Sequence, residues 1–110
     1  MAIQKSLELE SGIVLPEAYI RIDTFTYISR VNENSRVELS ILIYKDLLAR
    51  QMNKPEVVSL TQTCTGEDFN TYFDLTVLEQ PGVNILSQAY NWLKTQDFFK
   101  DAIDVIGNKE

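Results

Sequence analysis

The sequence predicts an α+β fold, mainly antiparallel β, in which a small sheet or sandwich carries C-terminal helices packed on one face or end. Two observations predict it. Over most of residues 3–63 apolar residues alternate with polar ones, a spacing typical of half-buried strands. From residue 67 to residue 107 the apolar spacing changes to three and four, which is typical of helices. Because the segments between strands leave no room for crossover helices, we expect antiparallel pairing within a single domain, residues 1–110.

The strand-rich part contains four segments with this alternation or with many β-branched residues. They cover residues 3–9, 18–28, 37–44 and 57–63. Turn residues separate them at 10–12 and 32–35, and the second turn joins the two longest segments into an expected hairpin. Residues 45–54 lose the alternation, so they form either a short helical turn or an excursion loop that Pro55 closes.

The helical part has recognisable start signals. Thr65 and Asp68 have the spacing of a capping box, which predicts a short helix or turn from residue 67. Asn84 is the expected N-cap of a helix whose apolar face includes Leu86, Ala89 and Leu93. A last helix is expected from about Gln96 to Gly107, because apolar residues recur there at helical spacing.

One strand segment has apolar residues on both of its faces. Ile20, Ile22 and Ile28 occupy one face by alternation, and the opposite face carries three aromatic residues, Tyr19, Phe25 and Tyr27. A strand that is apolar on both faces is buried on both, either by helices of its own chain or by another subunit. These three aromatic residues are therefore the candidate interface, and we expect homo-oligomers if another subunit covers them.

The composition argues against several classes of function. The net charge is -6 and the basic residues form no run, so nucleic acid is an unfavourable partner. The chain has no histidine and one cysteine, Cys64, which excludes Cys–His zinc sites and Ser–His or Cys–His nucleophile pairs. We expect Cys64 to be a core thiol. The four scattered glycines form no phosphate-binding loop, so no cofactor is expected.

Carboxylates are the remaining route to acid–base or metal chemistry. The candidates are Glu67, Asp68 and Asp74 together with an acidic stripe that Asp97, Asp101 and Asp104 would form on the last helix. A metal-dependent enzyme would use this stripe, but a solvated helix face is the better explanation, because no calcium-loop pattern is present. We therefore expect no metal site, no catalytic residues and no enzymatic activity.

The N-terminal residues have neither the apolar block of a signal peptide nor a stretch long enough to cross a bilayer. We expect no contact with a membrane. With a single cysteine and no such signal, folding in a cytoplasm is the expectation.

Several short stretches carry a family resemblance. They are Leu9-x-x-Gly12, Ala18-Tyr19-x-Arg21-Ile22, Ile41-Leu42-Ile43-Tyr44-Lys45-Asp46 running into Ala49-Arg50, Gln88-Ala89-Tyr90-Asn91-Trp92-Leu93-Lys94, and Phe99-Lys100-Asp101-Ala102. Together they resemble small proteins encoded among the tail genes of tailed bacteriophages, especially those that infect Gram-positive hosts. The resemblance implies a structural or assembly role in or around the tail, with a β-sandwich of the type seen in receptor-binding modules. No functional residues follow from it.

The leading hypothesis from the sequence is a non-enzymatic phage structural or tail-associated protein that acts through protein–protein contacts. Its partners would be other copies of itself or other tail proteins, in the host cytoplasm during assembly and in the virion afterwards. The alternative is a soluble phage-encoded binding module, either an assembly chaperone or an inhibitor of a host protein. The acidic surface is the observation that suggests this alternative.

Overall fold

A computed structural model describes residues 2–28 and 35–105 of the chain. Within them the strands are β1 (Ala2–Glu8), β2 (Val14–Ile28), β3 (Arg36–Tyr44), β4 (Val58–Thr65) and β5 (Ile103–Val105). The helices are α1 (Leu47–Gln51), α2 (Gly66–Phe73), α3 (Leu75–Leu78), α4 (Ile85–Leu93) and the 3₁₀ turn η1 (Asp97–Phe99). The turn expected at residues 32–35 and the helix stop expected at residue 107 lie almost entirely outside the described residues.

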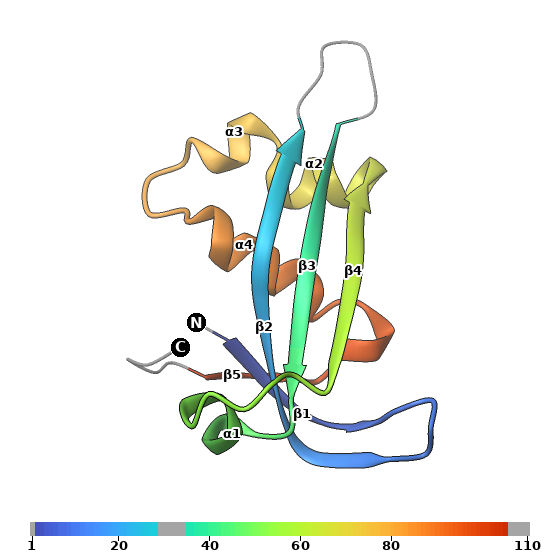
Figure 1. The fold of residues 1–110 in the computed structure, drawn as a ribbon. Helices are drawn as coiled ribbons and strands as arrows, with labels where there is room; N and C mark the ends of the chain where they lie inside the picture. The colour runs from blue at the N-terminus through green and yellow to red at the C-terminus, as the bar shows by residue number, and fades with distance from the viewer. Residues whose placement is uncertain (1, 29–34, 106–110) are drawn as a thin grey trace.

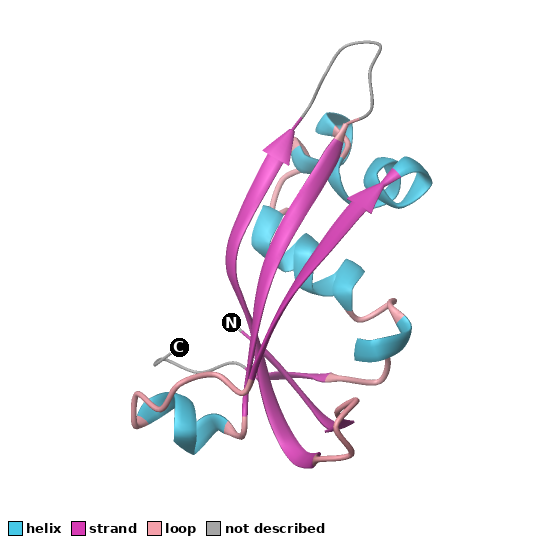
Figure 2. Ribbon diagram, turned by 45° about the vertical axis from the view of Figure 1, so that its right-hand side comes forward, coloured by secondary structure: helices cyan, strands magenta, loops and turns pink. Residues whose placement is uncertain are grey.

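The five strands form one antiparallel sheet in the order β4-β3-β2-β1-β5. The first four follow one another as hairpins, and β5 returns from the C-terminal region to pair with β1 (Figure 1). Helices α2, α3 and α4 lie on one face of this sheet, whereas α1 lies at its lower end beyond the other face (Figure 2). The predicted α+β class is confirmed. The sandwich alternative is wrong, because the second layer consists of helices.

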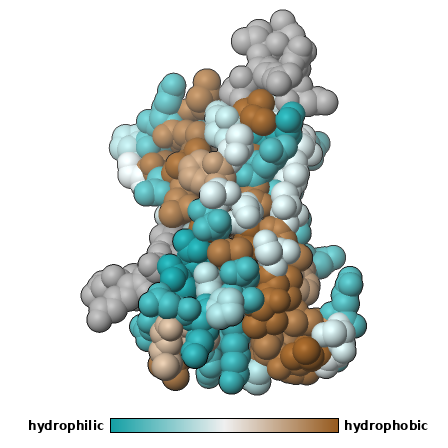
Figure 3. Space-filling view, viewed as in Figure 1, coloured by the Kyte–Doolittle hydropathy of each residue, from teal (hydrophilic) through white to brown (hydrophobic). Residues whose placement is uncertain are grey.

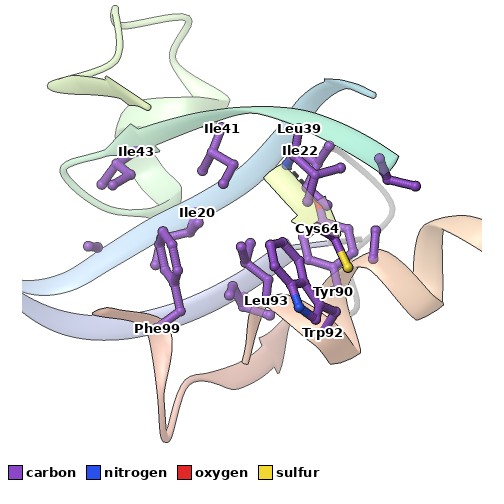
Figure 4. Close-up of a cluster of buried hydrophobic side chains, with 14 of the residues drawn as sticks. Ile20, Ile22, Leu39, Ile41, Ile43, Cys64, Tyr90, Trp92, Leu93 and Phe99 are labelled. Atoms are coloured by element: carbon purple, nitrogen blue, oxygen red, sulfur yellow. Dashed lines mark hydrogen bonds between the residues drawn. The ribbon is translucent and has the colours of Figure 1, made fainter. Parts of the chain in front are cut away.

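The main core lies between the sheet and the helices. Alternate residues of β2 and β3 point toward α4, as the sequence pattern predicts. Among them Ile20, Ile41 and Ile43 are each 0% exposed. Trp92 and Leu93 of α4 meet them from the helical layer (Figure 4). The sheet and α4 therefore stabilise each other by burying one continuous apolar surface.

A β-bulge in β2 changes which face its later residues occupy. Ile22 pairs with Ile41 but Thr24 pairs with Ser40, so β2 has one extra residue, Asp23, at this point. A bulge of one residue turns the following side chains to the opposite face. The hydroxyl of Tyr90, on α4, accepts a 2.8 Å hydrogen bond from the Ile22 N–H beside the bulge (Figure 4).

The bulge corrects the expected placement of the aromatic residues in this strand. Phe25 pairs with Leu39 and Tyr27 pairs with Val37, and both partners belong to the main core. Phe25 and Tyr27 therefore lie on the helix-covered face, and Tyr19 lies on the other. The prediction that the three share one face was wrong because strict alternation ignores the extra residue.

The last predicted helix is also wrong. Residues 96–105 form η1, a turn and strand β5, and the chain turns at Asp101, whose φ of 69° is left-handed. Phe99 still reaches the main core with 0% exposure. The apolar residues whose spacing suggested a helix include this one buried ring and the residues of strand β5. The strand forms because it pairs with β1, which lies about a hundred residues away in sequence.

The other helix signals have mixed outcomes. Asn84 caps α4 as predicted, because its Oδ1 accepts hydrogen bonds from the N–H groups of Leu86 (2.8 Å) and Ser87 (3.2 Å). Thr65 precedes α2 as the box predicts, but its side chain makes no capping hydrogen bond. Residues 45–54 take the helical alternative: α1 begins after Asp46, whose Oδ1 accepts from the Ala49 N–H at 2.8 Å.

Candidate functional site: an apolar pocket beside a free strand edge

The three candidate interface residues do not form one surface. Tyr19 is 0% exposed and lies in a small second cluster with Ala2 and Tyr44, where the two tyrosine rings meet edge to face at 6.2 Å between centroids. Its hydroxyl is buried without a hydrogen-bond partner in the described part of the chain. Burial raises the pKa of Tyr19 above its ordinary value. In this structure Tyr19 is covered by its own chain.

The other two candidates differ in exposure. Tyr27 donates a 2.8 Å hydrogen bond from its hydroxyl to the carbonyl oxygen of Phe73, and its ring centroid lies 5.6 Å from that of Phe69. Tyr27 therefore ties β2 to the C-terminal end of α2, where helix carbonyls lack intrahelical partners. Phe25 is 38% exposed. Its role in an interface stays a prediction.

A pocket of about 430 Å³ lies elsewhere, at the lower end of the helix-covered face. Three segments that are distant in sequence line it: the turn between β1 and β2, the start of β4, and η1. The lining residues are Leu9, Glu10, Ser11, Ile13, Val57, Val58, Leu60 and Phe98. In Figure 3 the apolar surface gathers in this region, on the lower right-hand side of the molecule.

The turn between β1 and β2 positions one wall of the pocket. The Leu9 N–H donates to the Ile13 carbonyl and the Gly12 N–H donates to the Leu9 carbonyl, both at 2.8 Å. Gly12 has a φ of 88°, a left-handed conformation that favours glycine. This tight turn leaves Ile13 55% exposed at the rim of the pocket.

The opposite wall comes from η1 and β4. The Phe98 ring packs edge to face on the buried Phe99 at 5.0 Å between centroids, and Lys5 Nζ lies 3.4 Å from the Phe98 carbonyl oxygen. Phe98 nevertheless remains 39% exposed and Val57 remains 45% exposed. The pocket therefore presents aromatic and aliphatic side chains to solvent on a wall that the fold holds in place.

The pocket adjoins an unpaired strand edge. Within the described residues β4 pairs with β3 alone, and its eight residues contain neither proline nor a charged side chain. Charges, prolines and short length are the usual means by which edge strands avoid pairing with other chains. The other edge strand, β5, has three residues within the described part of the chain. The edge of β4 thus lacks protection that natural edges commonly have.

A second exposed apolar surface surrounds α1. Leu48 is 61% exposed and Met52 is 59% exposed, and with Lys45 and Lys54 they line a shallow hollow. Arg50, also on α1, lies over the Tyr44 ring at 5.6 Å from its centroid. Apolar side chains on α1 are therefore set among basic residues.

Three of the carboxylates proposed as chemical candidates, Asp68, Asp74 and Asp104, have structural partners. Asp68 Oδ2 accepts a 3.0 Å hydrogen bond from Trp92 Nε1, and Asp74 caps α3 through the Thr76 N–H. The expected stripe of Asp97, Asp101 and Asp104 does not form one helix face, since these residues lie in η1, a turn and β5. Asp104 forms a 2.8 Å salt bridge with Lys94. In residues 2–28 and 35–105 no three acidic or cysteine residues come together as a potential metal site.

Cys64 lies in the main core and is 0% exposed. Burial, with a smaller contribution from the Asp68 carboxylate, raises its pKa to about 12. Because the thiolate is the reactive form, this thiol is held in its unreactive protonated state at neutral pH.

Sequence patterns alone do not single out the pocket residues. Two signals were present: the run Ile13-Val14-Leu15, which breaks alternation directly after Gly12, and the pair Phe98-Phe99, of which a single helix face accommodates one ring. Neither signal shows that these segments meet Val57. That meeting depends on the sheet order and on the path of residues 94–102.

None of the helices in the described residues is long and apolar enough to span a bilayer. Comparison of the chain with protein-family models, with curated proteins and with solved structures found no match.

Proposed function

We propose that this chain is a non-enzymatic phage structural or tail-associated protein that acts through protein–protein contacts. The observation that carries the proposal is the apolar pocket beside the unpaired edge of β4. Exposed apolar side chains that gather around a concave pocket commonly mark interaction sites. Ile13, Val57 and Phe98 supply it here, each more than a third exposed.

The chemistry of the pocket supports contact with another protein more than catalysis. Its lining is aliphatic and aromatic, and Glu10 and Ser11 are the polar members. Catalysis needs a positioned nucleophile, acid or base next to the bound substrate. Apolar burial is instead the main source of free energy in most protein–protein association.

The phage assignment has its support in the sequence resemblance. The stretches that carry it include residues 41–46, which join β3 to α1, and residues 88–94, which form most of α4. They belong to the framework that holds the pocket and α1 in place. The resemblance thus supports a shared structural design in which contact surfaces, and not catalytic residues, carry the role.

Mass spectrometry of purified tailed particles tests the assignment. Particles of a phage that encodes this chain would be separated from free protein by density gradient. The proposal predicts peptides of this chain in the particle fraction at a level comparable with other tail proteins. Their absence from the particles, when the soluble lysate contains them, would contradict a place in the virion.

A soluble binding module is the second candidate, and the net charge of -6 favours it, because charge complementarity speeds and orients association with a basic partner. A tagged chain would retrieve one specific host or phage protein from a lysate. The Phe98→Asp variant should lose that protein, and the Leu75→Asp variant, altered at another exposed apolar residue, should keep it. Equal retrieval by both variants would show that the pocket is not the binding site.

A further inference from the structure

Two exposed apolar surfaces of this chain have opposite charge. The segment that carries α1, residues 45–54, contains three basic residues and one acidic residue, a net charge of +2 in a chain of net charge -6. The turn from β1 to β2, residues 8–13, contains two acidic residues, Glu8 and Glu10, and no basic one. Glu17, further along β2, lies instead beside Lys45 and Asp46. The charged member of the pocket lining is Glu10.

The apolar groups of the two surfaces are also complementary in form. Leu48 of α1 and Met52, the C-cap residue that follows this helix, are four residues apart, so they lie on the same side and project together. The pocket is concave, with a volume of about 430 Å³. Methionine is flexible and adapts to irregular apolar cavities. Five of the nine large apolar side chains that are exposed in the described residues belong to these two surfaces: Ile13, Leu48, Met52, Val57 and Phe98.

The two surfaces cannot meet within one chain. The residues that line the pocket and those around α1 share no member, and the two regions lie on opposite sides of the lower end of the sheet (Figures 1 and 2). α1 is fixed there by its own contacts, since Leu47 packs against the Tyr19 and Tyr44 cluster. α1 therefore cannot occupy the pocket of its own chain, whereas α1 of another copy is free to do so.

We propose that the pocket of one copy receives α1 of the next copy, with Leu48 and Met52 against Ile13, Val57 and Phe98. Lys45 and Lys54 then face the acidic turn that contains Glu8 and Glu10. This inference rests on the proposed function and names its partner, a second copy of the chain. The two surfaces differ, so the contact is head to tail, and each added copy leaves one free surface at either end. Such contacts close into a ring or continue as a filament.

Complementing variants test the head-to-tail contact directly. Leu48→Glu disables α1 and leaves the pocket intact, whereas Ile13→Glu disables the pocket and leaves α1 intact. Both residues are exposed, so both variants should fold, which circular dichroism checks. Light scattering behind a sizing column then gives the solution mass of the wild type, of each variant and of their equimolar mixture.

The proposal predicts a wild-type mass that rises with concentration beyond that of a dimer. Each variant alone should keep the monomer mass of 12.6 kDa. The mixture should form a 1:1 dimer that grows no further, because it holds one intact pocket and one intact α1. The wild-type association should weaken at high salt, since charge pairs at the rim are screened. Leu75→Glu, on α3 and 53% exposed, is the matched control and should associate as the wild type does.

Three results would overturn the inference. Variants that associate as the wild type does would place the contact on another surface, and the proposed function would stand. Variants that are monomeric alone and remain monomeric when mixed would indicate a contact that uses the same surface on both copies. A wild type that is monomeric at every concentration would exclude self-association, and the particle analysis would then decide the proposed function separately.

Discussion

The two faces of the sheet differ sharply in what covers them. On the face covered by α2 and α4, 18 buried residues form one continuous cluster, whereas the opposite face has a buried cluster of three residues, Ala2, Tyr19 and Tyr44. Elsewhere that face presents residues such as Thr24, Ser59 and Thr61, which are exposed. The helical layer therefore holds the fold together. The lower end of the sheet, with its pocket and α1, keeps large apolar side chains exposed, and we propose that these side chains contact other molecules.

The largest contrast should come from truncating a leucine in each region. Leu93→Ala, in the main core, removes a fully buried side chain, and leucine truncations of this kind cost about 2–5 kcal/mol. Leu48→Ala, on exposed α1, should change the free energy of unfolding by less than about 0.5 kcal/mol. Urea unfolding followed by tryptophan fluorescence measures both. Similar losses of unfolding free energy in the two variants would show that α1 stabilises the fold as much as the main core does.

Alkaline pH should weaken the helix-covered face through Cys64. Its folded-state pKa is about 12, above the ordinary value of 9.0. The unfolded chain therefore loses this proton from pH 9 upward while the folded chain keeps it, so stability is complete below pH 9 and falls as pH rises toward 12. One such proton contributes a slope of about 1.4 kcal/mol per pH unit.

The Cys64→Ala variant supplies the control for this titration, because other groups also lose protons in that range. Its free energy of unfolding should fall less steeply between pH 9 and 11 than that of the wild type. Parallel curves for the two proteins would show that the thiol loses its proton equally in both states, contrary to the deep burial of Cys64.

The same substitution, tyrosine to phenylalanine, removes one buried hydroxyl on each side of the sheet and so compares the two faces. Tyr90→Phe leaves the buried Ile22 N–H without its acceptor, a loss of about 1–3 kcal/mol. Tyr19→Phe removes a buried hydroxyl that has no partner among the described residues, so stability should rise by about 1 kcal/mol. Differential scanning calorimetry measures both as shifts of Tm in opposite directions. A loss of stability in both variants would mean that the Tyr19 hydroxyl has a partner in solution.

The elements predicted correctly from sequence are those fixed by local patterns. Alternation gave β1 and β3, and the short polar side chain of Asn84 gave the start of α4. The errors lie where a distant contact decides. The bulge at Asp23 turns Phe25 and Tyr27 toward the helices, and β5 exists because β1 offers it an edge.

The candidate site could not be read from the sequence for the same reason. Its walls come from the turn after β1, the first residues of β4 and Phe98 of η1, and only the sheet order brings them together. The aromatic residues predicted as an interface were placed on one face by strict alternation alone. Of these, Tyr19 is instead part of a core.

We propose that the exposed apolar surfaces at the lower end of the sheet are used for assembly. The solution mass of the wild-type chain, measured by light scattering behind a sizing column over a hundredfold range of protein concentration at low salt, tests this proposal. We expect a mass that increases with concentration above 12.6 kDa and falls back toward it in high salt. A constant mass of 12.6 kDa at every concentration would contradict it, because Ile13, Leu48 and Phe98 would then remain in contact with water.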